Sequence, residues 1–232
     1  MIIQQIQTVL DDGYELNFSD IFNKSFENFK KTALISGLIF ILMSVVFAVI
    51  GIGVFSSFYA LSSFTDLLTN FNVLNFSIAG TIIYVLSAAL VSGLIAPLYA
   101  GIIKIADLAN KNQDFGIATS FEYYQSKYFV QLFLSTFLIS IVTTTISTIL
   151  QLLGYQIIGV LIVYIISFFT FLHIPLIIFG NLTAIESIQA SILTVKHQIL
   201  ILLALLIVAF LFVCLGIFAF CIGIFFTFPF IF

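Results

Sequence analysis

The chain has 232 residues, of which 62% are hydrophobic and only 7% are charged. Soluble globular domains carry about 25% charged residues, so this composition, with a mean hydropathy of +1.28, excludes an ordinary soluble fold. The formal net charge is -3, and the few scattered basic residues give no support for nucleic-acid binding. We therefore expect an all-α membrane protein of several spans, with membrane lipid as its surroundings.

Residues 1–16, MIIQQIQTVLDDGYEL, are too polar and acidic for a signal peptide, which needs a basic start and an apolar centre. We interpret them as a short cytoplasmic N-terminal tail. The rest of the chain, 17–232, contains no segment that resembles a separate soluble domain. It is therefore predicted to form a single transmembrane domain.

An amphipathic helix is predicted directly before the first apolar run. In NFSDIFNKSFENFKK, apolar residues recur at helical spacing on one face, and charged or amide residues cover the other. Asn17 can cap the start of this helix, with Asp20 placed to complete a capping box. We expect the helix to lie on the membrane surface, with its apolar face at the headgroup boundary. That face contains Phe18, Ile21, Phe22, Phe26 and Phe29.

Long uncharged stretches predict the membrane spans. About 20 apolar residues cross a hydrocarbon core of roughly 30 Å, and the run from Thr32 to Thr65 is the first that is long enough. Gly154 and Gln156 interrupt a later run, and Gly216 and Gly223 interrupt the last one. We predict six spans, near 33–56, 78–103, 128–153, 156–180, 197–214 and 217–232, with five spans as the alternative.

The basic residues predict the orientation. All 7 are lysines, and the six-span arrangement places every one of them on the same side of the membrane. Positive charge near the ends of spans marks the cytoplasmic side. We therefore expect both ends of the chain on the cytoplasmic side of a bacterial inner membrane. The lysines are Lys24, Lys30, Lys31, Lys104, Lys111, Lys127 and Lys196.

Two later segments begin as the first one does. Thr119 and Glu122 precede the third span, and Thr183 and Glu186 precede the fifth. Both pairs have the Thr-x-x-Glu spacing of a capping box, in register with Asn17 and its partner three residues on. Each segment leads directly into an apolar run. We expect three copies of one unit, in which a surface helix is followed by two spans.

The prolines support the same repeat. The chain has 3 prolines, and Pro97, Pro175 and Pro229 fall one each in the second, fourth and sixth predicted spans. A proline inside a helix removes a backbone donor and bends the helix. We therefore predict a kink in the second span of every unit. The quasi-repeats would cover about 17–106, 117–181 and 183–232.

Small and hydroxyl residues indicate how the spans pack. The second span has alanine, serine and glycine every four residues, in rows that end at Ala100 and Gly101, and such rows allow another helix to approach closely. The third span is rich in hydroxyls between Ser135 and Ser147. These hydroxyls can bond within their own helix, bond across to a neighbour or line a polar path.

His173 is the only ionisable candidate inside a span, and such a group is a functional hypothesis by default. It can bond a carbonyl freed by the kink at Pro175, or it can sense protons. One histidine cannot form a metal site, and Cys214 and Cys221 lie in apolar surroundings that suit packing residues. We predict no catalytic residue, metal or cofactor. Lys104 can pair with Asp107 on one helix face.

Three segments resemble a known group of proteins. DIFNKSFENFKK, AIESIQASILTVKHQ and LGIFAFCIGIFFTFPF are similar to uncharacterised bacterial multi-spanning proteins, including YciC-like membrane proteins and the membrane domain of some glycerophosphodiester phosphodiesterases. The resemblance covers most of the chain. It implies a six-span inner-membrane protein with repeated surface helices, and it brings no catalytic residues.

Three functional hypotheses follow. The first is a non-enzymatic membrane protein that acts in envelope or lipid homeostasis, or as a membrane subunit of an assembly, with a second copy or a membrane protein as its partner. The second is a transporter or channel for a lipid-like or apolar solute. The third is a membrane enzyme. Carotenoid oxygenases, a label that similar proteins sometimes carry, resemble a soluble propeller that holds iron with four histidines, whereas this chain has 2 histidines.

Overall fold

The computed structural model describes residues 17–58 and 77–218, and for 46–58 and 215–218 it describes the backbone alone. This part of the chain folds into helices joined by short turns, without a strand. The expected all-α class is therefore confirmed for the described residues. The helices are α2 (Phe18–Phe58), α4 (Ile78–Asn110), the 3-10 helix η2 (Ile117–Gln125), α5 (Phe129–Leu152), α6 (Gln156–Thr170), α7 (His173–Ile178), α8 (Ala184–His197) and α9 (Ile199–Phe218).

Several helices have the length and hydropathy of membrane spans. In the described chain 4 segments qualify, and α8 with α9 raises the number to 5 if this pair, bent by 98°, is counted as one span. These helices indicate a membrane-embedded, multi-pass protein. The predicted sixth span, 217–232, lies almost wholly outside the described residues, as does the kink predicted at Pro229. The qualifying segments are Phe18–Val45, Ile78–Asn110, Phe129–Leu152 and Gln156–Ile178.

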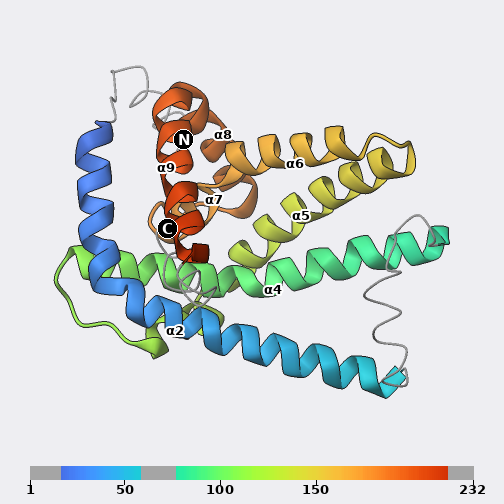
Figure 1. Ribbon diagram of the computed structural model, residues 1–232, viewed down its shortest axis with the longest axis horizontal. Coiled ribbons are helices and arrows are strands. Elements are labelled where there is room, and N and C mark those ends of the chain that lie inside the picture. Colours follow the sequence, from blue (N-terminus) through green and yellow to red (C-terminus); the bar gives the residue numbers. More distant parts are fainter. Residues whose placement is uncertain (1–16, 59–76, 219–232) are drawn as a thin grey trace.

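The first surface helix and the first span form one helix, α2, rather than two. The helix runs without interruption from Phe18 to Phe58, although Figure 1 shows its dark-blue start pointing in a different direction from the rest. The hydroxyl of Thr32 donates to the carbonyl of Asn28 at 2.9 Å, a bond within the helix that favours bending. No Gly or Pro lies between the two parts to separate them, so a bend replaces the expected break.

The phenylalanine face of α2 lies against protein as well as facing outward. Phe18, Phe22 and Phe26 stack in a row along the helix. The ring of Phe212, from α9, lies with its centroid 6.3 Å from that of Phe22 and 6.0 Å from that of Phe26. The expectation that this whole face meets the headgroup boundary therefore needs correction, because an aromatic ring of α9 covers part of it.

Among the described helices, α4 and α5 make the most extensive contact, and Figure 1 shows them side by side. Ala89 and Ala96 in α4 are fully buried. A Cβ at Gly93 would lie 2.9 Å from the ring of Phe133 and 3.1 Å from its carbonyl oxygen. The small residues of the second span therefore form a contact surface for α5, as the sequence predicts. Helix α4 continues through buried Pro97 to Asn110 as one helix, and the kink predicted at this proline stays a prediction.

The 3-10 helix η2 packs on the second half of α4. A Cβ at Gly101 would lie 2.1 Å from the carbonyl oxygen of Ser120, so the two backbones touch. The Tyr124 hydroxyl donates to the carbonyl of Leu94 at 2.8 Å. This carbonyl lies three residues before the proline of α4, where the pyrrolidine ring disturbs helix bonding. Burial raises the pKa of Tyr123 to about 12, which keeps this core hydroxyl neutral.

Three amphipathic segments lead into long helices, but they do so with different geometry. The first is continuous with its span in α2, η2 is a separate 3-10 helix before α5, and α8 meets α9 at 98°. In Figure 1 the turn between α5 and α6 lies at one end of the molecule, and η2, α7 and α8 lie toward the other. The threefold repeat stays a prediction.

Candidate functional site

The fourth span is broken before its proline. Helix α6 ends at Thr170 and α7 begins at His173, and together they cover Gln156–Ile178. Pro175 is the third residue of α7. Because the first turn of a helix has no internal partners for its N–H groups, a proline is tolerated there. Pro175 therefore begins a new helix instead of kinking a continuous one. The backbone groups at the break need other partners, and two side chains, His173 and Ser191, supply them.

His173 supplies one of these contacts and also bonds α5. Its Nδ1 lies 2.6 Å from the carbonyl oxygen of Thr170, and its Nε2 lies 3.1 Å from Oγ1 of Thr136 in α5. A carbonyl can only accept, so Nδ1 carries the hydrogen and Nε2 accepts from the threonine hydroxyl. Both nitrogens of a neutral imidazole are thereby satisfied. Of the two roles that the sequence allows for His173, this geometry supports bonding to the helix break.

Ser191 of α8 closes the same break from the other side. Its hydroxyl accepts from the N–H of Leu172 at 3.2 Å and donates to the carbonyl of Phe169 at 2.8 Å. Ser191 is fully buried. One side chain therefore satisfies a donor and an acceptor that the break leaves without helical partners, and it fixes α8 against the junction of α6 and α7.

The start of α8 is capped twice. The Thr183 N–H donates to Oε2 of Glu186 at 3.0 Å, and the Glu186 N–H approaches Oγ1 of Thr183 at 3.5 Å, which is the capping box that the spacing indicates. In addition, the Ala184 N–H donates to Oε1 of Gln131 in α5 at 2.8 Å. At the start of α2, Oδ1 of Asn17 accepts from the Asp20 N–H at 3.3 Å.

Thr119 and Glu122 do not form the predicted cap. Thr119 lies inside η2, and its Oγ1 accepts from the N–H of Gly116, three residues earlier, at 3.3 Å. Glu122 is exposed. The physical reason is the contact between Ser120 and Gly101, which holds this segment against α4 and starts the helix before the threonine. The Thr-x-x-Glu spacing is thus present without an N-cap at its threonine.

A lysine joins the first segment to the end of α4. Nζ of Lys31 donates to Oδ1 of Asn112 at 2.8 Å and to the carbonyl of Ala109 at 3.3 Å. A cation at this position is favoured because the last carbonyls of a helix carry partial negative charge. Nearby, Asp107 pairs with Lys104 at 3.2 Å, as predicted, and with Lys111 at 2.8 Å.

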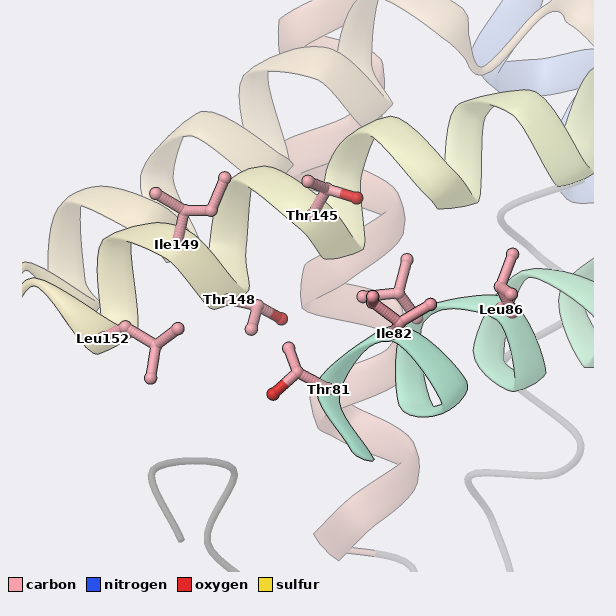
Figure 2. Close-up of a pocket in the computed structure, with 8 residues that line it drawn as sticks. Thr81, Ile82, Leu86, Thr145, Thr148, Ile149 and Leu152 are labelled. Carbon is pink, nitrogen blue, oxygen red and sulfur yellow. The ribbon is translucent and has the colours of Figure 1, made fainter. Parts of the chain in front are cut away.

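The described chain also contains a pocket, between the first turns of α4 and the last turns of α5. Its volume is about 280 Å³. Figure 2 shows threonine hydroxyls and branched aliphatic side chains on both helices facing this space. It lies at the opposite end of α4 from Lys31 and η2. The lining residues are Thr81, Ile82, Val85, Leu86, Thr145, Thr148, Ile149 and Leu152.

The polar side chains described above hold helices together and do not converge as acid, base and nucleophile. Within the described ranges, no group of three or more His, Cys, Asp or Glu side chains is placed to hold a metal ion. The ring nitrogens of His173 bond the hydroxyl of Thr136 and the carbonyl of Thr170.

Sequence reasoning missed Ser191, Gln131 and Asn112, each of which joins segments far apart in the chain. Ser191 carried one signal, since it falls four residues after Ser187 on the small-residue face of α8. Gln131 is an amide at the start of an apolar run. Its position predicts a hydrogen-bond partner but does not identify that partner. The hydroxyl of Tyr128 is likewise bonded to Oδ1 of Asn181.

The chain matches no protein-family model, no curated protein and no solved structure.

Proposed function

We propose that the chain is a non-enzymatic, multi-pass membrane protein whose amphipathic segments form its working surface at one face of the bilayer. In this role it acts in envelope or lipid homeostasis, or as the membrane subunit of an assembly. The observation that carries the proposal is the attachment of all three segments to the spans. Lys31 bonds the end of α4, Tyr124 bonds a carbonyl of α4, and Ser191 bonds the break between α6 and α7.

These attachments matter because a surface helix can transmit an event only if it is fixed to the spans. Helix α8 illustrates the arrangement. Its buried face bears small residues such as Ser187 and Ala190, whereas Ile185 is 62% exposed and Ile192 is also exposed. Exposed isoleucines on a helix that is anchored on its other face suit contact with the headgroup boundary of a membrane. They equally suit an apolar patch on a membrane partner.

The depth of α8 tests the proposal. The chain has 0 tryptophans, so Ile185→Trp gives a protein with a single indole. In vesicles that contain brominated lipids, we expect bromine near the headgroup to quench this fluorescence more strongly than bromine deep in the chain. Ile165→Trp, at a position of α6 that is 56% exposed, is the matched control and should show the opposite order. Equal quenching of both variants by deep bromine, or of neither by any bromine, would contradict the proposal.

The orientation is a further prediction. We propose that the end with the lysines faces the cytoplasm, as the distribution of positive charge favours. With the native cysteines replaced, Tyr155→Cys, in the exposed turn between α5 and α6, should react with an impermeant maleimide added outside intact cells. Asp114→Cys, in the exposed loop after α4, should react only after permeabilisation. The reverse pattern would overturn the orientation and leave the membrane embedding intact.

A role as a carrier for a lipid-like solute is the second candidate. The observation in its favour is the pocket between α4 and α5, which combines aliphatic walls with threonine hydroxyls. Beyond it, the hydroxyl of Ser140 donates to that of Ser92 at 3.2 Å, so polar contacts continue along the same helix pair. The hydroxyls of Ser92 and Ser140 bond each other, so this pair joins the two helices more directly than it lines a path.

A further inference from the structure

The pocket between α4 and α5 has two threonine hydroxyls that the fold leaves unused, those of Thr145 and Thr148, and Thr148 is the buried one of the pair. Thr148 is only 4% exposed, yet its hydroxyl makes no hydrogen bond with any described residue. No described side-chain oxygen is both shielded and without a partner, so the Thr148 hydroxyl opens onto the pocket, where Figure 2 shows it. By contrast, the hydroxyl of Thr143, also buried, donates to the carbonyl of Ile139 at 2.9 Å.

The walls of the pocket select the chemistry of its occupant. Ile82, Leu86 and Ile149 supply aliphatic surface and are all exposed, so the pocket opens sideways from between two candidate membrane spans. Its volume of about 280 Å³ is at the lower end of ligand sites, which begin at roughly 300 Å³. The space therefore suits part of an acyl chain rather than a whole lipid.

The depth of the pocket selects the polar partner. Thr81 lies in the first turn of α4, and Leu152 is the last residue of α5, so the pocket lies near the ends of both candidate spans. In a bilayer, the ends of spans lie close to the polar interface. The ester groups of a glycerolipid join its acyl chains to its headgroup, so they occur at that depth. An ester carbonyl is an acceptor, which complements a free hydroxyl donor.

We propose that this pocket binds the part of an acyl chain that lies next to the glycerol of a membrane glycerolipid, and that the Thr148 hydroxyl donates to the ester carbonyl of that chain. This inference rests on the membrane embedding in the proposed function, and it adds a lipid site at the end of the spans away from the amphipathic segments. The site is specific for the acyl ester and indifferent to headgroup charge, because no charged side chain lines the pocket among the described residues.

Photolabelling tests the site. The full chain is reconstituted in vesicles of phosphatidylcholine that contain a phosphatidylcholine with a diazirine on its acyl chain, and labelled peptides are mapped by mass spectrometry. We expect labels to concentrate on residues 81–86 and 145–152, above the level on the exposed face of α6. Thr148→Val keeps the shape of the side chain and removes the donor. It should reduce pocket labelling about threefold to tenfold, the effect of one hydrogen bond.

Thr143→Val is the matched control, since it makes the same change on the same helix at a hydroxyl bonded internally, and it should leave pocket labelling unchanged. Thermal unfolding of both variants in detergent shows whether each is folded. Even labelling over the outer faces of α4, α5 and α6, or equal pocket labelling with Thr148→Val, would overturn the lipid site and leave the proposed function standing. Absence of labelling on every exposed span face would instead contradict the membrane embedding itself.

Discussion

Replacing Gly101 with alanine should lower the free energy of unfolding by about 3 kcal/mol, at the upper end of what overpacking costs. A Cβ at this position would lie 2.1 Å from the carbonyl oxygen of Ser120 and 2.4 Å from its Cα. These are backbone atoms, so no change of side-chain rotamer can relieve the overlap. Helix η2 must move away from α4, and Tyr123, in the same core cluster as Ala100, must move with it.

Gly116→Ala is the matched control. A Cβ there meets nothing within 4 Å, and the backbone of Gly116 is extended, with φ -150°, which any residue adopts. Thermal unfolding in detergent should separate the two variants clearly, and limited proteolysis should cut residues 113–127 faster in Gly101→Ala alone. If Gly101→Ala unfolds at the same temperature as Gly116→Ala, then η2 does not touch α4 as described.

This contact shows where sequence reasoning succeeds and where it ends. The rows of small residues in the second span predict that something packs closely there, and Gly93 and Gly101 do lie at close contacts. The pattern does not say that one partner is a helix side chain, Phe133, and the other the backbone of η2. Small residues indicate that another segment can approach closely. Which segment does so depends on parts of the chain that are far away in the sequence.

The capping motifs show that one sequence spacing can give two different local structures. Thr183 and Thr119 have the same spacing to a glutamate, but only Thr183 caps a helix. A cap stabilises a helix by about 1 kcal/mol. The packing of η2 on α4 competes with such a cap and buries Ser120 and Tyr123. Where the two compete, packing decides where the helix starts. The proline of α4 likewise does not end its helix, and a tyrosine hydroxyl bonds a carbonyl three residues before it.

Ser191→Ala should cost about 2–4 kcal/mol of unfolding free energy, because it leaves a buried N–H and a buried carbonyl without their partner. The two groups are the Leu172 N–H and the Phe169 carbonyl, which the serine hydroxyl joins at 3.2 Å and 2.8 Å. Inside a membrane no bulk water can replace the lost bonds. His173 cannot take over, since its ring nitrogens are committed to Thr170 and Thr136. The break between α6 and α7 should therefore loosen.

Ser187→Ala separates this effect from the loss of a buried hydroxyl as such. Ser187 lies one turn earlier in α8 and is equally buried, but its hydroxyl donates only to the carbonyl of Ala184, in its own helix, at 2.8 Å. That carbonyl keeps its helical partner, so we expect a change below about 1 kcal/mol. Amide exchange at Leu172 should accelerate in Ser191→Ala and stay slow in Ser187→Ala. Equal stability and equal exchange in the two variants would mean that the apolar packing of Ile174 and Ile177 holds the helix break and that the serine does not stabilise it.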